Sequence, residues 1–263
     1  MGIDRPPVVF ITGASSGIGE ALARHYAERG ALLGLVARRL ALLETLREEL
    51  QARHGIRVLI YQADVSEPSQ MARAAEDFLR EAGVPHVVIA NAGVSVGTLT
   101  EYPEDFAAFK RVLETNVLGL PATFAPFIAP MRQKQRGVLA GIASVAGIRG
   151  LPGAGAYSCS KAAAINYLES LRVEMHGSGV RVSTILPGYI ETPMTAVNPY
   201  PMPFILPADV AARRIARAID RGASYTVVPW QMAIVARLLR CLPNALFDPI
   251  FARAGRKPRG FLR

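Results

Sequence analysis

Short apolar runs rich in Val, Ile and Leu alternate with longer amphipathic stretches along most of the chain. Uninterrupted β-branched runs of this length are typical of strands buried on both faces of a parallel sheet. The pattern predicts seven such strands, at 8–11, 32–37, 58–62, 87–90, 138–143, 180–186 and 225–228.

The stretches between these strands have the spacing of helices. They lie at 17–29, 40–53, 68–82, 106–131, 157–176 and 207–221, and the fourth is expected to break near Gly119-Leu120-Pro121. Regular alternation of strand and helix predicts an α/β fold, a Rossmann-like, doubly wound and mostly parallel seven-stranded sheet with helices on both faces. Ligands bind such sheets beyond the carboxyl ends of the strands, so residues that follow the predicted strands are the candidates for function.

Composition agrees with one large domain and excludes several classes of protein. Of 263 residues 51% are hydrophobic, which is a globular profile. The two cysteines, Cys159 and Cys241, have no metal-ligand spacing and favour a reducing compartment. The first residues do not resemble a signal peptide, and no run approaches the roughly 18 apolar residues of a membrane-spanning helix. We expect a catalytic domain at 1–229 and an apolar, basic helical extension at 230–263.

A glycine-rich turn joins the first strand to the first helix. Its sequence is Thr12-Gly13-Ala14-Ser15-Ser16-Gly17-Ile18-Gly19. Glycines let the backbone turn sharply and approach a pyrophosphate, which rests on the N-terminus of the helix. In this strand–turn–helix context the turn favours dinucleotide binding over an ordinary loop.

The second strand ends at Ala37 and is followed by Arg38 and Arg39. A site specific for NAD places an acidic residue at the end of this strand, where this chain has Ala37, whereas arginine binds a 2′-phosphate through charge-assisted hydrogen bonds. The sequence therefore predicts NADP(H), the alternative being two solvated arginines at a helix start. Asp64 and Val65 follow the third strand, where Asp64 either accepts from the adenine amine or caps the next helix.

A tyrosine and a lysine lie four residues apart in the segment Tyr157-Ser158-Cys159-Ser160-Lys161. On a helix both side chains share one face. A neighbouring ammonium is expected to lower the pKa of the phenol from its ordinary value near ~10, which suits a general acid/base at a carbonyl or alcohol oxygen. Cys159 points to another face and is expected to pack or to lie at an interface.

These motifs together resemble the short-chain dehydrogenase/reductase family in its common single-domain form. The matching residues are the turn 12–19, Asp64, Asn91-Ala92-Gly93, Asn116, Ser144, Tyr157, Lys161, Pro187-Gly188 and Thr192. Ala90 is a small departure, because the family often has an asparagine there.

The resemblance implies a four-residue active site. Tyr157 would be the general acid/base, Lys161 would lower its pKa and hold the nicotinamide ribose, Ser144 would bond the substrate oxygen, and Asn116 would position a water. It also implies that Pro187, Gly188, Ile190 and Thr192 contact the carboxamide end of the cofactor, and that Asn91, Ala92 and Gly93 lie near its ribose.

Two segments bear on the substrate and on partners. The segment 189–206 is apolar and proline-rich and is expected to form a lid, with Met194, Tyr200, Met202, Phe204, Ile205, Val94, Val96, Leu151 and Pro152 giving a hydrophobic pocket. Apolar residues recur at helical spacing between Trp230 and Phe251, and the last eight residues, 256–263, are basic. This extension is an interfacial membrane anchor, a helix pair docked on the domain, or an oligomer contact.

The sequence therefore predicts an NADP(H)-dependent oxidoreductase that transfers a hydride between nicotinamide and a hydrophobic carbonyl or secondary alcohol. The alternative is a non-catalytic dinucleotide-binding sensor or scaffold. The net charge of +9 suits anionic cofactors or a membrane surface, and no nucleic-acid motif or metal-ligand set is present. We expect a cytoplasmic homodimer or homotetramer, with peripheral membrane contact left open.

Overall fold

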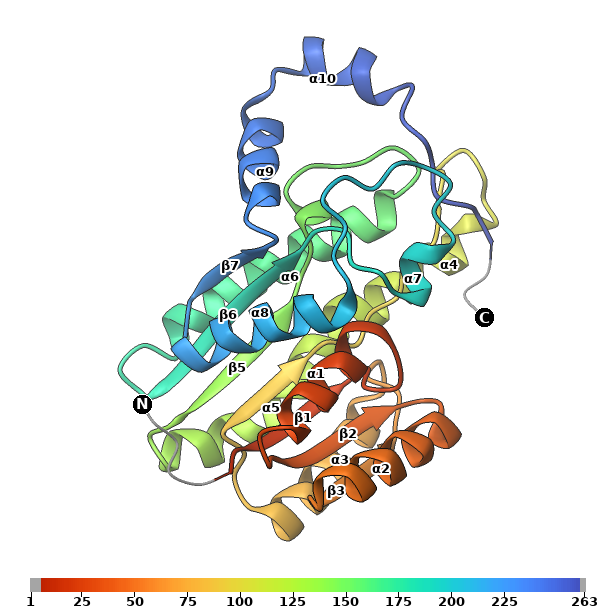
Figure 1. Cartoon of the computed structure of the whole chain (residues 1–263). Helices are drawn as coiled ribbons and strands as arrows, with labels where there is room; N and C mark the ends of the chain where they lie inside the picture. Colours follow the sequence, from red (N-terminus) through yellow and green to blue (C-terminus); the bar gives the residue numbers. More distant parts are fainter. Residues whose placement is uncertain (1–5, 261–263) are drawn as a thin grey trace.

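A seven-stranded sheet crosses the computed structural model, which describes residues 6–260 (Figure 1). Its strands are β1 (Val8–Thr12), β2 (Leu32–Ala37), β3 (Val58–Gln62), β4 (Val87–Ala90), β5 (Gly137–Ile142), β6 (Val180–Pro187) and β7 (Tyr225–Val228). Their order is β3-β2-β1-β4-β5-β6-β7, and every neighbouring pair is parallel. All seven predicted strands are confirmed to within one residue at each end.

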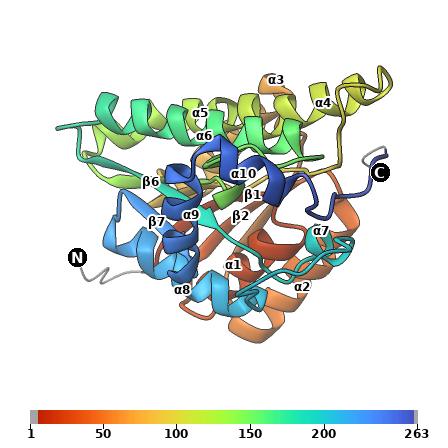
Figure 2. The ribbon, with the colours of Figure 1, turned by 90° about the horizontal axis from the view of Figure 1, so that it is seen from above.

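Helices cover both faces of the sheet, as predicted (Figure 2). One face carries α1 (Gly17–Ala27), α2 (Leu40–His54) and α8 (Ala208–Arg221). The other carries α3 (Pro68–Ala82), α4 (Asp105–Leu113), α5 (Gly119–Gln133) and α6 (Gly155–Glu174). The short α7 (Pro193–Ala196) follows β6, and α9 (Gln231–Cys241) and α10 (Asn244–Phe251) follow β7.

Alternation along the central strands divides the core into two layers. Val9 and Ile11 of β1 pack with α1, α2 and α8, whereas Phe10 between them packs with α3 and α5. The Phe10 ring meets that of Phe78 edge to face, with centroids 5.0 Å apart. Because these side chains are fully buried, the strands form a rigid base for the loops at their carboxyl ends.

The long helix of the fourth crossover differs from its prediction. No break occurs at Gly119; a π-helical turn, Glu114–Leu118, joins α4 to α5 without interruption. The Gly119 amide bonds back to the Glu114 carbonyl, five residues earlier, so the wider turn accommodates Pro121 within the first turn of α5.

This continuous helix also corrects an expectation about membrane-spanning length. Within the described residues, Asp105–Gln133 is the one helix long and apolar enough to cross a membrane, with a mean hydropathy of 1.3. Phe124, Phe127 and Met131 are nevertheless fully buried against the sheet, which is the usual position of a core helix.

The strand order reverses between β1 and β4, which creates the crevice expected of a doubly wound sheet. The residues that follow β1, β4, β5 and β6 meet there. Residues 1–5 and 261–263 lie outside the described part of the chain, and with them the start of the catalytic domain, the signal-peptide prediction and the end of the basic tail.

Candidate active site

A cavity of ≈540 Å³ lies at the carboxyl ends of the strands. Apart from Gly19 and Asn116, it is lined by every residue predicted to hold the cofactor or to act in catalysis, namely Gly13, Ser15, Ser16, Gly17, Ile18, Arg38, Arg39, Asp64, Val65, Asn91, Ala92, Gly93, Ser144, Tyr157, Lys161, Pro187, Gly188, Ile190 and Thr192. The lining comes mainly from the loops that follow β1 to β6 and from α6, so the fold brings together residues that are distant in sequence.

The glycine turn has the geometry that a phosphate-binding turn requires. Gly13 has φ +68°, and a Cβ on Gly19 would lie 2.3 Å from the Gly13 carbonyl oxygen. Asn91 fixes the turn, because its Nδ2 donates to the carbonyls of Thr12 and Gly13 at 3.0 and 3.2 Å. Gly19 does not line the cavity itself, but its lack of a side chain allows the turn to pack closely against the start of α1.

The first amides of α1 remain available to a ligand. Its N-cap, Ser16, makes no side-chain capping hydrogen bond. The hydroxyls of Ser15 and Ser16 instead accept from Arg39 Nη2, at 2.9 and 2.7 Å. Free N–H groups at a helix N-terminus, next to a guanidinium, fit the pyrophosphate of a dinucleotide.

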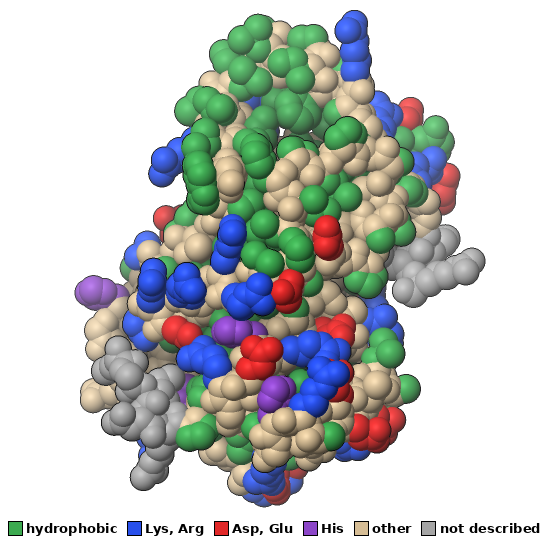
Figure 3. Space-filling model, in the orientation of Figure 1, with side chains coloured by type: hydrophobic (Ala, Val, Ile, Leu, Met, Phe, Trp, Pro, Cys, Tyr) green, Lys and Arg blue, Asp and Glu red, His purple; other side chains and the backbone are tan. Residues whose placement is uncertain are grey.

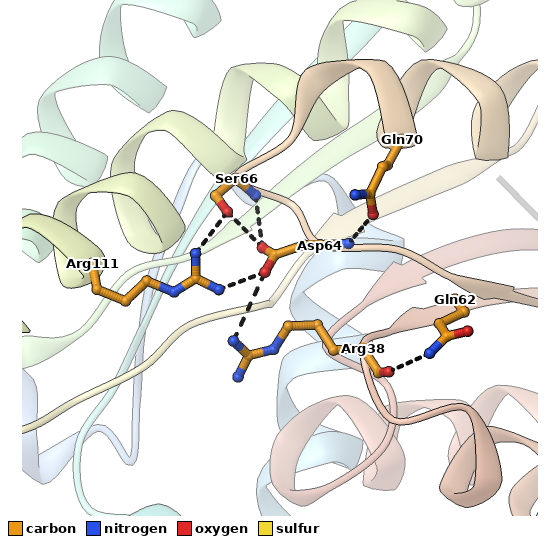
Figure 4. A network of polar contacts seen from close by, with 6 residues as sticks. All are labelled: Arg38, Gln62, Asp64, Ser66, Gln70 and Arg111. Carbon is orange, nitrogen blue, oxygen red and sulfur yellow. Dashed lines mark hydrogen bonds and ion pairs between the residues drawn. The ribbon is translucent and has the colours of Figure 1, made fainter. Parts of the chain in front are cut away.

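Asp64 also lines the cavity, and its carboxylate lies in a network of polar contacts (Figure 4). Ser66 donates to Asp64 Oδ1 from both its amide and its hydroxyl, at 3.0 and 2.7 Å. Arg111 of α4 donates to Oδ2, and Arg38 Nη1 lies 3.8 Å from the same oxygen. Burial acts to raise the pKa of Asp64, but the bonds from Ser66 and Arg111 outweigh it and hold the pKa below its ordinary value.

Two corrections follow from this network. Asp64 does not cap α3, whose N-cap is Glu67; it closes the turn before that helix. Arg111 was not predicted, because it lies 47 residues from Asp64 in sequence and no local motif marks it.

The tyrosine and the lysine occupy the start of α6, opposite the glycine turn. Lys161 is 4% exposed, its Nζ donates to the carbonyl of Ile142 at 2.8 Å, and it lies 5.8 Å from the centroid of the Tyr157 ring. Ser144, at the end of β5, caps a short 3₁₀ turn (Val145–Gly147) by accepting from the Ala146 amide.

The pKa of Tyr157 differs from its prediction. Burial raises it, and a hydrogen bond with Ser144 only partly offsets the rise. Burial also lowers the pKa of Lys161 to about 8. The four-residue spacing predicts that Tyr157 and Lys161 lie close together, but it does not predict how deeply they are buried. In the structure, burial of the phenol has a larger effect on its pKa than any neighbouring group.

Asn116 lies behind the cavity wall, on the π-helical turn. Its Oδ1 accepts from the Val94 amide at 2.8 Å, and its Nδ2 donates to the Val94 carbonyl and to Ser160 Oγ, both at 2.9 Å. A Cβ on Gly93 would be 3.3 Å from Asn116 Oδ1 and 3.5 Å from Lys161 Nζ, so the amide and the ammonium flank the same glycine. Asn116 thus holds the loop after β4 against α6.

The segment after β6 forms one wall of the cavity. Thr192 and Thr195 make a capping box on α7, and Ile190 pairs with Leu206, so the segment 191–205 leaves and rejoins the domain at one point. Met194 and Val197 of this segment line the cavity, and Val197 was not predicted. The hydrophobic pocket is smaller than expected, because the cavity lining excludes Val96, Leu151, Pro152, Tyr200, Met202, Phe204 and Ile205.

The chain beyond α10 returns to the same loops, which the sequence did not predict. Gly97 N donates to Pro258 O at 3.0 Å, and Arg259 binds Asp105 and Glu104. Lys257 Nζ donates to Ser95 Oγ at 3.2 Å and to the Met194 carbonyl at 3.0 Å.

Cys159 and Cys241 are free and exposed. Of the two alternatives expected for Cys159, packing and an interface, its exposure leaves the interface.

The fold and the cavity define a doubly wound α/β protein with a Tyr–Lys pair at the ligand-binding edge of its sheet. A family model described as short chain dehydrogenase matches residues 7–200. The chain therefore belongs to the short-chain dehydrogenase family, whose members are oxidoreductases.

Individual relatives agree with this assignment. An "Uncharacterized oxidoreductase" of Myxococcus xanthus (strain DK1622) is 40% identical over 239 residues, which cover 91% of this chain and 94% of that protein. The "11-beta-hydroxysteroid dehydrogenase-like 2" of Arabidopsis thaliana is 36% identical, covering 84% and 73%. A solved short-chain dehydrogenase from Sphingobium yanoikuyae, in complex with NADPH, matches with a TM-score of 0.76 and 29% identity, covering 91% and 97%.

Proposed function

We propose that this protein is an NADP(H)-dependent oxidoreductase that interconverts a hydrophobic ketone or aldehyde and its alcohol, with Tyr157 as the general acid/base. The observation that carries the proposal is that Ser144, Tyr157 and Lys161 line the same cavity as the glycine turn. A bound nicotinamide would supply or accept the hydride. The division of the chain at residue 229 into a catalytic domain and an extension is part of the same proposal.

The residues around the phenol would move the proton. A phenol whose pKa is raised is protonated at neutral pH, so Tyr157 would donate to the substrate oxygen during carbonyl reduction. Ser144 would donate to the same oxygen, and Lys161 would stabilise the phenolate that Tyr157 becomes. Asn116 would act as a positioning residue, through Val94 and Ser160.

The preference for NADP(H) rests on the charged side chains that line the cavity after β2 and β3. Arg38 and Arg39 both line it, and their side chains are exposed. Asp64, the one carboxylate in the lining that would disfavour a 2′-phosphate, already binds Arg111. The complex of the Sphingobium yanoikuyae relative with NADPH is consistent with this preference.

The substrate class rests on Val94, Met194 and Val197, the apolar side chains in the cavity wall beyond the Tyr–Lys pair. The plant relative named for a hydroxysteroid dehydrogenase is consistent with a lipid-like substrate. A homodimer or homotetramer is proposed through α4–α6, where Phe106, Leu118 and Val173 are 72%, 58% and 62% exposed. We also propose a cytoplasmic location, with peripheral membrane contact left open, and the two free thiols support it.

The test separates binding from chemistry. Tyr157→Phe is expected to bind NADPH as the wild type does and to lose at least ~10²-fold in kcat/KM on a panel of hydrophobic ketones. Tyr225→Phe, whose phenol is 50% exposed on β7, is the control and should keep both properties. Equal activity of wild type and Tyr157→Phe would refute the role of Tyr157, and NADPH binding without turnover of any carbonyl would favour the non-catalytic sensor.

The cofactor preference has its own measurement. Each charge-assisted contact to a 2′-phosphate contributes about 1.5–3 kcal/mol, so Arg38→Ala should lower the preference for NADPH over NADH at least tenfold. Arg73→Ala, an exposed arginine on α3, should leave it unchanged. Tighter binding of NADH than NADPH to the wild type would refute the assignment.

A further inference from the structure

The last helices form an arch above the carboxyl ends of the strands (Figure 1). We call residues 230–254 the C-terminal arch; it contains α9, α10 and the turns that flank them. Met232 and Ala236 of α9 are buried in the core, which fixes the first leg. The contacts of Lys257 and Arg259, described above, fix the end of the second leg.

The top of the arch is held by Arg149, from the loop that follows β5. Its guanidinium donates to the Leu239 and Leu242 carbonyls and to Asn244 Oδ1, and it lies 3.8 Å from the centroid of the Phe247 ring. The turn between α9 and α10 therefore has a defined position, although little of α10 is buried.

The exposed surface of the arch carries several large apolar side chains. Trp230, Ile234 and Leu238 follow one another at intervals of four residues along α9, and they are 65%, 49% and 66% exposed. Leu246 and Ile250 of α10 are 55% and 60% exposed. Hydrophobic side chains gather over this part of the surface, around a hollow beneath the arch (Figure 3). Contiguous exposed apolar residues of this kind mark an interaction surface.

Positive charge accompanies these apolar residues. Residues 230–254 contain three basic side chains, Arg237, Arg240 and Arg253, and one acidic side chain, Asp248, a net charge of +2. Within the part of the chain that the structure describes, Arg237 and Arg253 have no carboxylate partner.

We propose that the C-terminal arch binds the surface of an anionic lipid bilayer. An anionic bilayer offers both an apolar interior for Leu238 and Ile250 and a negative surface for the unpaired arginines. A second copy of this chain would instead bring two arches of net positive charge together. Pro243 and Pro249 keep the helices short, so the arch lies on the membrane and does not span it, with Trp230 at the depth that indole side chains prefer.

One functional consequence rests on the proposed function. The loops that hold the arch, after β4, β5 and β6, are also the loops that surround the cavity. Binding of the arch would therefore direct the cavity towards the lipid, from which a hydrophobic carbonyl compound could enter.

The test uses the full-length protein and flotation with two kinds of vesicle, phosphatidylcholine alone and phosphatidylcholine mixed with phosphatidylglycerol. Binding is expected to the anionic vesicles and to weaken as salt is added. Leu238→Asp/Ile250→Asp should lower this binding more than tenfold. Leu42→Asp, on α2 and 43% exposed, introduces one such charge away from the arch and should leave vesicle binding unchanged.

A second pair of variants tests the electrostatic contribution. Each arginine near an anionic surface strengthens binding about fivefold, so Arg237→Gln/Arg253→Gln should lower it on the order of 25-fold. Arg73→Gln/Arg172→Gln, two exposed arginines of α3 and α6, changes the net charge equally and should have little effect. Thermal melting and NADPH binding confirm that each variant is folded.

Either of two flotation results would overturn the proposal: the wild-type protein does not float with anionic vesicles at low salt, or the arch variants float as well as the wild type does. If vesicle binding is absent and light scattering shows that Leu238→Asp/Ile250→Asp dissociates an oligomer, the arch is a contact between copies of the chain. Neither readout depends on turnover, so failure here is distinct from failure of the proposed activity.

Discussion

Lys161 is predicted to destabilise the fold that it serves. It is 4% exposed and keeps one hydrogen bond, to the Ile142 carbonyl. Its pKa falls from 10.5 to about 8 through burial. A shift of this size means that holding the ammonium at pH 7 costs about 3 kcal/mol relative to the unfolded chain.

Replacing Lys161 by methionine removes that cost. The change also leaves the Ile142 carbonyl without the lysine, and an unsatisfied buried acceptor costs about 1–3 kcal/mol. Lys161→Met should therefore raise the free energy of unfolding at pH 7 by up to about 2 kcal/mol, which corresponds to a rise in Tm of up to roughly 4–8 °C, while abolishing turnover.

The pH dependence gives this prediction its sign. Because the pKa of Lys161 is lower in the folded state, the unfolded chain holds more protons between about pH 8 and 10.5, and the stability contributed by this group rises through that window. Below pH 8 the full cost is present. The advantage of Lys161→Met should thus be largest near neutrality and disappear towards pH 10.5.

Urea denaturation at pH 7 and pH 10, followed by circular dichroism, measures both quantities. Lys110→Met is the control, because that side chain is 67% exposed and should change the stability by less than ~0.5 kcal/mol. A variant at position 161 that is less stable than the wild type at pH 7, or whose advantage does not change with pH, would refute the reasoning.

Two further predictions concern the cavity. Gly19→Ala should weaken NADPH binding at least tenfold in fluorescence titrations, because its Cβ would lie 2.3 Å from the Gly13 carbonyl oxygen. Gly150→Ala is the control and should bind NADPH normally, because no atom lies within 4 Å of the added Cβ. Unaltered binding by Gly19→Ala would contradict the turn geometry. Lys257→Met should raise KM more than it lowers kcat in steady-state assays, because it frees the Met194 carbonyl in the wall beside the substrate; an unchanged KM would show that this contact does not position the wall.

Most of the fold could be predicted because buried parallel strands have a simple signature. The runs 32–37 and 87–90 contain no charged residue, and each is followed directly by a polar residue, Arg38 or Asn91. The cavity residues were identified for the same reason, since they come directly after strands whose carboxyl ends must meet at one edge.

What could not be predicted depends on contacts between distant segments. Arg111 binds Asp64 across 47 residues, and Lys257 binds the Met194 carbonyl across 63. The pKa of Tyr157 depends on how completely the cavity wall is dehydrated, which no spacing of residues encodes. The π-helical turn was missed because a proline near a glycine normally indicates a break.

Asp64 Oδ2, which lies close to both Arg111 and Arg38, restricts how the cofactor preference of the protein can change. Arg38 lies 3.8 Å from that oxygen, so an aspartate introduced at position 38 would face an existing carboxylate, and repulsion between like charges would oppose it. A conversion towards NADH should therefore require compensation at position 64 or 111 together with the change at 38. In a laboratory selection for NADH use, such paired changes should appear more often than the single substitution.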